Sequence, residues 1–152
     1  MGTYAEFEVQ TDQRVTTVDV TDRVAAQLSA DERGTCTVFV RHTTAGMSVN
    51  EAEPRLLGDI EHALESIVPA TGWDHDELDG SPASEASGTS AEERPAGSES
   101  AGNADAHLRS MLLGRDVTVP VADGRPDLGT WQSILLVECD GPRTRTVTVV
   151  SE

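Results

Sequence analysis

Short apolar runs bounded by turn-forming residues recur along this chain and constrain its fold more than any other feature. Alternating apolar and polar residues at 4–10 and 14–21 predict two strands, joined in a hairpin by Thr11-Asp12-Gln13. From Thr35 to His42, the same alternation predicts a strand with Cys36, Val38, Val40 and His42 on one face. The imidazole of His42 would therefore lie at the end of an apolar row.

Helical periodicity appears in two longer segments. In Ala52–Val68, apolar residues recur every three or four positions behind Pro54, which suits a first helical turn, and His62 falls on the polar face. A second helix is predicted from Asn103, interpreted as an N-cap and not a ligand, to a stop at Gly114. A short helix from Asp22, its predicted cap, to Ser29 precedes both.

The order of these elements predicts the fold class. Three final strands are predicted at 116–121, 130–140 and 143–151, with Asp123-Gly124 and Gly141-Pro142 as the turns between them. The chain thus runs through two strands, a helix, a strand with a short extended piece, a long helix, a short helix and three strands. Because strands and helices do not alternate regularly, we expect one α+β domain over residues 1–152 and not a doubly wound parallel sheet.

One internal segment differs in composition from the rest. Of the 22 residues from Ser81 to Gly102, 17 are Ser, Ala, Gly, Pro or Thr, and four of the other five are Glu. Such a segment buries too little apolar area to offset the entropy of ordering it. We expect a flexible acidic loop, with a functional lid as the alternative.

The charge of the chain excludes several classes of partner. It has 27 Asp and Glu against 11 basic residues, all of them Arg, and a formal charge of −16. Phosphate backbones and anionic lipids are bound largely through clustered Lys and Arg, so nucleic-acid and membrane roles are not expected. Carboxylates spread over a chain without Lys are typical of a halophile's protein. No apolar stretch approaches the length of a membrane helix and no signal peptide is evident, so we expect a cytoplasmic protein.

The motifs that carry chemistry are polar clusters near the ends of predicted elements. No nucleotide-binding fingerprint, C-x-x-C or H-E-x-x-H occurs, and Cys36 and Cys139 are expected to be small buried hydrophobes. The clusters that remain are, in order, Arg41-His42-Thr43-Thr44-Ala45-Gly46, Asn50-Glu51, Trp73-Asp74-His75, Asn103-x-x-x-His107, Trp131-Gln132 and Glu138-x-Asp140-Gly141-Pro142-Arg143.

A set of motifs in this order resembles the signature of the YjbQ-like family along about the whole chain: His42-Thr43-Thr44-Ala45-Gly46, Asn50-Glu51, Ala106-His107-Leu108 with Leu112-Leu113-Gly114, Leu128-Gly129-Thr130-Trp131-Gln132, Glu138 and Asp140-Gly141-Pro142-Arg143. The family is also labelled secondary thiamine-phosphate synthase. The resemblance implies an α+β fold of two small sheets with helices, assembled as a homotrimer. It also implies a weak transfer activity that joins an aminopyrimidine diphosphate to a thiazole phosphate and releases pyrophosphate. Residues 81–102 would then be an insertion relative to the family.

A three-histidine metal site is one interpretation that the resemblance supports. His42, His75 and His107 could bind one zinc ion and leave a position for water or substrate, as catalytic zinc sites do, with magnesium as the other divalent candidate. Their convergence is implied by the resemblance and not by their spacing. The alternative is three separate histidines in ordinary hydrogen bonds.

The remaining candidates concern the substrate. Thr43, Thr44 and Gly46 could present hydroxyls and backbone N–H groups to a phosphate, or could form a plain exit from a strand. Because the chain lacks Lys, Arg143 is the first candidate for a diphosphate clamp and Arg41 the second, although each could pair with a surface carboxylate. Glu138, alone or with Asp140, could act as a base or hold a cation, or could be solvated. The sequence further assigns substrate contacts to Asn50 and Gln132, and places Trp131 in the core or at a subunit interface.

The function expected from these residues is transfer of the thiamine-phosphate synthase type on a small phosphorylated metabolite. The catalytic group would comprise His42, His107, Arg143 and Glu138. Two alternatives stay open at this stage. One is a metal-dependent hydrolase of a small phosphorylated or acyl metabolite that uses a zinc-bound water. The other is a non-catalytic trimer that binds a small anionic metabolite.

Overall fold

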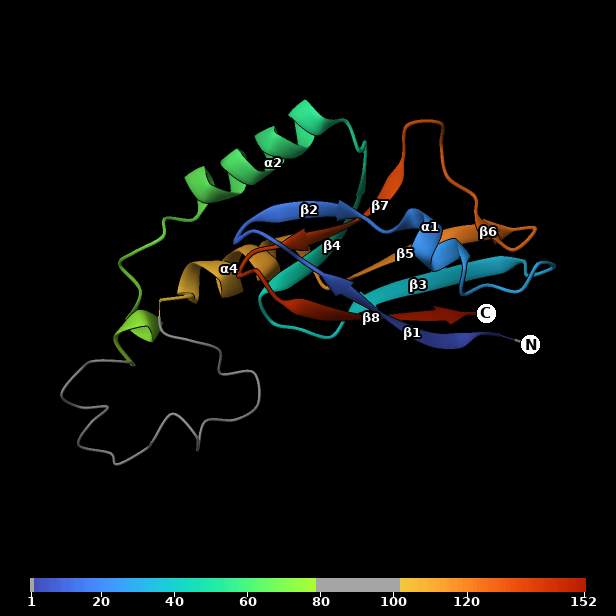
Figure 1. The fold of residues 1–152 in the computed structure, drawn as a ribbon, viewed down its shortest axis with the longest axis horizontal. Coiled ribbons are helices and arrows are strands. Elements are labelled where there is room, and N and C mark those ends of the chain that lie inside the picture. Colours follow the sequence, from blue (N-terminus) through green and yellow to red (C-terminus); the bar gives the residue numbers. More distant parts are fainter. Residues whose placement is uncertain (1, 79–101) are drawn as a thin grey trace.

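Two antiparallel sheets pack face to face in the computed structural model, which describes residues 2–78 and 102–152 (Figure 1). Segment 79–101, which holds nearly all of the predicted acidic loop, lies outside the described residues. The larger sheet has the order β1-β8-β3-β5-β6 and the smaller one the order β2-β7-β4. The larger sheet comprises β1 (Tyr4–Gln10), β8 (Thr144–Ser151), β3 (Gly34–Val40), β5 (Asp116–Ala122) and β6 (Arg125–Pro126). The smaller comprises β2 (Thr16–Asp19), β7 (Ser133–Glu138) and β4 (Ala45–Asn50).

The main core lies between the sheets, where alternate residues of both point inward. Val38 of β3 pairs in register with Val149 of β8, and both are fully buried. Met47 of β4 and Leu136 of β7 belong to the same core from the other sheet. Full burial of such a side chain contributes roughly 1.5–3 kcal/mol, so the apolar residues at every second strand position stabilise the packing of the two sheets.

Helices cover the outer face of the smaller sheet. They are α2 (Pro54–Ile67) and α4 (Ala104–Leu113), with the 3-10 helix η1 (Asp74–Leu78) before α4. The short α1 (Thr21–Ala25), which follows β2, instead places Val24 in the main core. A second apolar cluster joins Leu64 of α2, Ala106 of α4 and Val137 of β7. The arrangement confirms the predicted α+β class with two sheets, and Cys36 and Cys139 are free and buried, as expected.

The predicted hairpin between the first two strands is wrong. β1 pairs with β8 in the larger sheet, whereas β2 pairs with β7 in the smaller one. Residues 11–15 therefore cross from one sheet to the other. This crossing pairs with the crossing between β7 and β8, because the Thr11 N–H donates to the Arg143 carbonyl at 2.8 Å and the Gly141 N–H to the Arg14 carbonyl at 2.9 Å. Long-range pairing prevails over the local turn signal.

The two long helices match their predicted spans to within two residues, whereas α1 ends at Ala25 and not at the predicted Ser29, and the caps also differ. Pro54 lies in the first turn of α2 as predicted, although the helix begins there and not at Ala52. The carboxylate of Glu53 accepts a 2.8 Å bond from the Leu56 N–H, which lowers the pKa of Glu53. Asp22 lies inside the first turn of α1, where Asp19 instead accepts from the Thr21 N–H. Asn103 occupies the N-cap position of α4 without capping it, since the Ala104 N–H donates to Asp76 at 2.9 Å.

Two glycines show why small residues stand where they do. Asp123-Gly124, with positive φ at both residues, forms the tight turn between β5 and β6. The turn was predicted to join the first two of three long strands near the C-terminus. It instead joins β5 to the short β6, and the next long strand, β7, belongs to the smaller sheet.

Gly46 lies in β4 under the end of α4, where an added Cβ would come within 2.7 Å of the Leu113 Cβ.

Candidate functional site

An open cleft of about 450 Å³ separates the end of β3 from α4. It contains two arginines, two histidines and two hydroxyl side chains, and none of its lining residues is Asp or Glu. The lining residues are Phe39, Val40, Arg41, His42, Thr43, His107, Ser110, Met111, Gly114 and Arg115. In a chain with a net charge of −16, such a lining marks a local concentration of hydrogen-bond donors and positive charge.

His42 lines this cleft just beyond the end of β3. Its Nε2 accepts a 2.9 Å hydrogen bond from the backbone N–H of Thr146 in β8. A neutral imidazole has one accepting and one donating nitrogen, so in the neutral ring the hydrogen is on Nδ1. The predicted placement of His42 at the end of the Cys36, Val38 and Val40 row is confirmed in outline, because those three residues are buried and the half-buried His42 follows them.

His107 reaches the cleft from α4, and His75 lies behind it. The rings of His75 and His107 make an edge contact, with centroids 5.0 Å apart and an interplanar angle of 61°. His75 lies on η1 beside Asp76, whose carboxylate caps α4. Two of the three predicted histidines therefore contact each other, and two line the same cleft.

These positions test how well the residues fit a metal. Among residues 2–78 and 102–152, no group of three His, Cys, Asp or Glu side chains is close enough to hold one ion. The Nε2 of His42 would also have to release the Thr146 N–H before it could coordinate. The described arrangement thus does not present a three-histidine ligand set.

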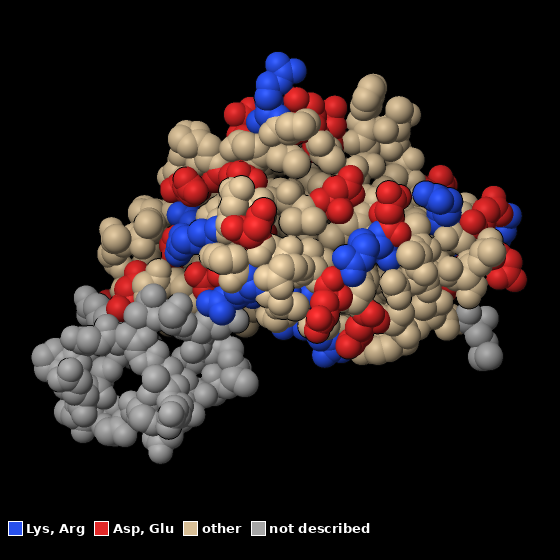
Figure 2. Space-filling view, viewed as in Figure 1, with Lys and Arg blue, Asp and Glu red and all other residues tan. Residues whose placement is uncertain are grey.

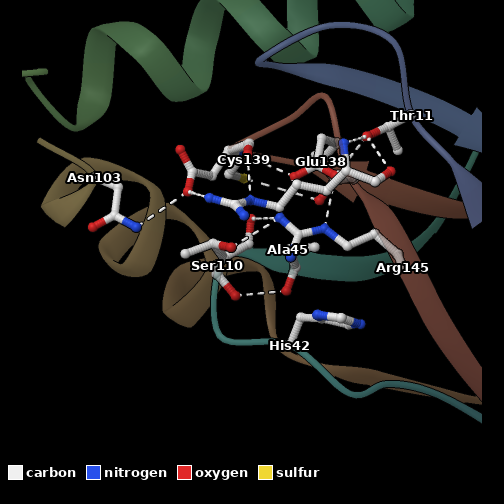
Figure 3. A network of polar contacts seen from close by, with 12 residues as sticks. Thr11, His42, Ala45, Asn103, Ser110, Glu138, Cys139 and Arg145 are labelled. Carbon is white, nitrogen blue, oxygen red and sulfur yellow. Dashed lines mark hydrogen bonds and ion pairs between the residues drawn. The ribbon is translucent and has the colours of Figure 1, made fainter. Parts of the chain in front are cut away.

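Glu138 lies away from the cleft in a buried network (Figure 3). Its carboxylate pairs with the guanidinium of Arg145, and both side chains are fully buried. Arg145 Nε donates to Glu138 Oε2 at 2.7 Å, and the Thr11 hydroxyl donates to the same oxygen at 2.9 Å. The Asp140 N–H donates to Oε1 at 2.9 Å, so three groups hold this carboxylate in place through four contacts.

Thr44 belongs to this network and not to the cleft lining. It is fully buried, and its hydroxyl and carbonyl oxygens accept bonds from Arg145 Nη2 at 2.8 and 3.2 Å. Thr43, by contrast, is exposed and lines the cleft. The structure thus separates the two threonines that the sequence grouped together.

Arg143 is held in the turn that follows β7. Its Nη2 contacts Asp140 Oδ2 and its Nε contacts the Asp140 carbonyl oxygen, both at 2.8 Å. Asn103 donates to the same Asp140 carboxylate at 3.1 Å, which links the turn to the start of α4. These contacts place Arg143 apart from the residues that line the cleft.

The other predicted substrate residues make local contacts. Asn50 lies at the end of β4, where its side-chain oxygen accepts from the Glu51 N–H. Gln132 accepts from the Gly129 N–H at 2.8 Å and so closes its own turn. Trp131 is 73% exposed, which excludes the core position considered for it and leaves the subunit interface as a prediction.

Arg41 and Arg115 differ in how much of their charge is already offset. Arg41 contacts Glu6 Oε1 at 3.0 Å, the Tyr4 hydroxyl at 2.7 Å and the Thr148 hydroxyl at 2.8 Å. Arg115 is exposed, and within the described parts of the chain it forms no ion pair. Arg115 was not among the residues predicted from the sequence, and its position directly after the helix stop at Gly114 is the signal that could have indicated it.

Buried ion pairs anchor the helix that carries His107. Asp105 is fully buried between Arg14, which contacts it at 2.9 Å, and Arg109, which contacts it at 2.8 Å. Arg109 also donates to the carbonyls of Leu64 and Val68 at the end of α2, at 3.2 and 2.7 Å. Ser110 donates to the Ala45 carbonyl at 2.6 Å, so α4 is fixed against both α2 and β4.

Comparison with known proteins decides the family. The family model described as UPF0047 protein YjbQ-like matches residues 5–151. The chain belongs to the YjbQ-like family. A UPF0047 protein from Methanothermobacter thermautotrophicus is 40% identical over 147 residues, which cover 95% of this chain and 87% of the relative. One from Archaeoglobus fulgidus is 40% identical over 145 residues, covering 95% and 97%.

Solved structures of YjbQ-like proteins have the same fold. A protein from Sulfolobus solfataricus, described as YbjQ-like and of unknown function, superposes with a TM-score of 0.80 and 32% identity, covering 100% of this chain and 99% of that one. A hypothetical protein from Aeropyrum pernix gives 0.77 and 38%, covering 96% and 95%. The resemblance in the sequence motifs is thus confirmed at the level of family and fold. In the described residues of this member, no helix has the length and apolar character to span a bilayer.

Proposed function

We propose that this chain is an enzyme that binds a small phosphorylated metabolite in the cleft between β3 and α4 and catalyses transfer of the thiamine-phosphate synthase type. One observation carries the proposal. In a strongly acidic chain, the cleft groups Arg41, His42, His107 and Arg115 without a carboxylate in its lining. Cationic and hydrogen-donating groups are those that bind phosphate and diphosphate oxygens.

The surrounding charge makes that cleft selective. Acidic side chains are scattered over the molecular face shown in Figure 2, with Arg between them. A phosphorylated ligand is repelled by most of such a surface, and a lining free of carboxylates is where its charge is best tolerated. The cleft volume of about 450 Å³ falls within the range of small-molecule sites.

The reaction proposed needs charge neutralisation more than proton transfer. The thiazole ring nitrogen supplies the electron pair of a new bond to the methylene carbon of the aminopyrimidine. The bond from that carbon to the diphosphate oxygen breaks, and the diphosphate leaves with its electron pair. Arg115 and Arg41 would offset the charge that grows on the leaving group, while His42 and His107 would donate hydrogen bonds to its oxygens.

Binding of inorganic diphosphate tests the site without a known substrate. Titration calorimetry of the full chain should show binding that weakens about tenfold in Arg115→Gln, because one charge-assisted contact is lost. Arg55→Gln is the matched control, since Arg55 is 92% exposed on α2 and makes the same charge change outside the cleft. Equal weakening in both variants would indicate a general charge effect and contradict the site.

Turnover is tested by supplying both phosphorylated substrates and measuring the joined product. Product that disappears in His107→Ala supports the proposal. Release of phosphate without the thiazole acceptor would instead support a hydrolase, and tight diphosphate binding without turnover a non-catalytic binder. Either result would overturn the transferase proposal.

The metal site and the homotrimer remain separate proposals. A zinc ion shared by His75 and His107, whose rings are in edge contact, would need a third ligand that the described residues do not supply, and magnesium is less suited to imidazole ligands. Metal analysis should then find about one zinc per chain, lost in His107→Ala, and metal-free protein that still binds diphosphate would overturn the idea. A trimer predicts a mass by light scattering three times the 16.2 kDa of the chain, and a single-chain mass would contradict it.

A further inference from the structure

Three chain segments change sheets at the same place, and one of them carries His42. Residues 11–15, 41–44 and 139–143 each cross between the larger and the smaller sheet. The 41–44 segment is bound to β8 beyond the last paired strand residues, since the Arg41 N–H donates to the Thr146 carbonyl at 3.1 Å. The return contact is from the Thr146 N–H to Nε2 of His42 at 2.9 Å. A side-chain nitrogen thus takes the place of a backbone acceptor in the ladder.

Arg145, the residue before Thr146, holds the other end of this segment. Its guanidinium donates to both oxygens of Thr44, and the Cys139 N–H donates to the Thr44 carbonyl at 3.1 Å. The position of the guanidinium is set in turn by the fully buried Glu138. Displacing either charge from this pair would leave the other buried without its partner, so the arrangement resists distortion. Thr146 therefore holds the ring of His42, and Arg145 holds Thr44, which lies two residues further along the chain.

The contact with Thr146 also decides which ring nitrogen of His42 carries hydrogen. A backbone N–H can only donate, so Nε2 must accept. A doubly protonated ring would place two N–H groups against each other at this position. The neutral ring with hydrogen on Nδ1 is the form that the contact selects.

We infer that Arg145 is a positioning residue: by holding Thr44 it fixes His42 against Thr146, and it thereby makes His42 a neutral donor, through Nδ1–H, to a phosphoryl oxygen in the cleft. The statement about the ring form stands on the contacts alone, whereas the phosphoryl acceptor rests on the proposed function. Glu138 acts through Arg145 and does not touch the ligand.

Long-range ¹H–¹⁵N correlation spectra test the ring form directly. In the ¹⁵N-labelled full chain, the signals of His42 are identified by their loss in His42→Gln. They should show a protonated Nδ1 and an unprotonated Nε2, both before and after addition of inorganic diphosphate. A ring protonated on Nε2, or on both nitrogens, in the wild-type chain would overturn the inference.

Conservative changes at Thr44 test the role of Arg145 without removing a buried charge. Thr44→Val keeps the shape but removes the hydroxyl acceptor, so diphosphate binding should weaken about tenfold and the His42 signals should broaden or show mixed ring forms. Thr44→Ser restores the hydroxyl and should restore both measurements. Thr118→Val, on the exposed face of β5, makes the same chemical change at a distance and should alter neither.

The two parts of the inference fail separately from the proposed function. A folded Thr44→Val chain with wild-type ring signals would show that Arg145 does not position His42. If Thr44→Val does not fold, the wild-type spectrum and Thr44→Ser still decide the ring form. Wild-type protein that shows the expected ring form but binds no diphosphate would leave the fixed imidazole intact, refute the phosphoryl acceptor and refute the proposed function.

Discussion

Glu138 and Arg145 form an ion pair in which neither side chain has any exposure to solvent. The pair lies where β7 leaves the smaller sheet and β8 enters the larger one. Removing two charges from water costs several kcal/mol each, and this cost is offset here by their mutual attraction and by the surrounding donors and acceptors. Glu138 is therefore part of the buried framework, and its surroundings do not resemble those of a solvated base.

Changing one member of this pair should destabilise the fold more than changing both. Glu138→Gln removes the negative charge that pairs with the buried guanidinium of Arg145, and the free energy of unfolding should fall by about 3–5 kcal/mol. The double variant Glu138→Leu with Arg145→Met should recover most of that loss. Urea unfolding monitored by circular dichroism measures both. A single variant within 1 kcal/mol of wild type would contradict the assigned role.

Arg109 should be the main polar link between the two long helices. Arg109→Met removes its bonds to the carbonyls of Leu64 and Val68 and one of the two cations on Asp105, which predicts a loss of about 3 kcal/mol in unfolding free energy. Hydrogen exchange should also accelerate at the end of α2.

Arg55→Met is the matched control for this change, because Arg55 is exposed on the same helix pair and contacts only Glu53 among the described residues. Its effect should stay within about 0.5 kcal/mol. Similar losses of unfolding free energy in the two variants would show that the buried contacts of Arg109 do not account for its effect.

The sequence predicted the elements of the fold better than their partners. The span of β1 and the start of α2 at Pro54 follow from local alternation and from the residues at the helix start. The pairing of β1 with β8 joins residues more than 130 positions apart, and no local pattern encodes it. The Ala45–Asn50 segment, expected only as a short extended piece, is strand β4 because β7 supplies its ladder partner.

The residues of the candidate site were also predicted only in part. His42 and His107 were predicted together because both lie in family motifs, and the structure places both in the lining of one cleft. Arg145 and Asp105 were missed, since a charged residue inside a strand or a first helical turn usually points to solvent in sequence patterns. Their burial depends on partners from other elements: Glu138 lies at the end of the preceding strand, and Arg14 is 91 residues from Asp105.

The two buried thiols predict how stability depends on alkaline pH. Burial raises the pKa of Cys139 from 9.0 to about 12 and that of Cys36 to about 11. In the unfolded chain both thiols ionise near pH 9, while in the folded chain they stay protonated. The free energy of unfolding should therefore be unaffected by these groups below pH 9 and fall between pH 9 and about 11–12.

Urea unfolding at pH 8 and pH 10 measures this slope, and a thiol reagent gives an independent check. Both cysteines should be unreactive at pH 8 until the chain unfolds, because the reactive thiolate is suppressed by burial. Cys139→Ala should reduce the alkaline slope. Rapid labelling of the native chain at pH 8 would show that the thiols are not buried as described.

The distribution of charge predicts that salt stabilises this protein. With a net charge of −16 and acidic side chains over its surface, the folded chain repels itself, and molar salt shortens the range of that repulsion to about 3 Å (Figure 2). Raising KCl from 0.1 to 2 M should increase Tm by roughly 10 °C, since each kcal/mol corresponds to about 2–4 °C for a chain of this size. The triple variant Asp12→Asn, Asp31→Asn, Asp127→Asn removes three exposed charges that form no ion pair with other described residues, so it should flatten the dependence. An unchanged dependence in that variant would mean that salt acts through burial of apolar surface and not through screening of the acidic surface.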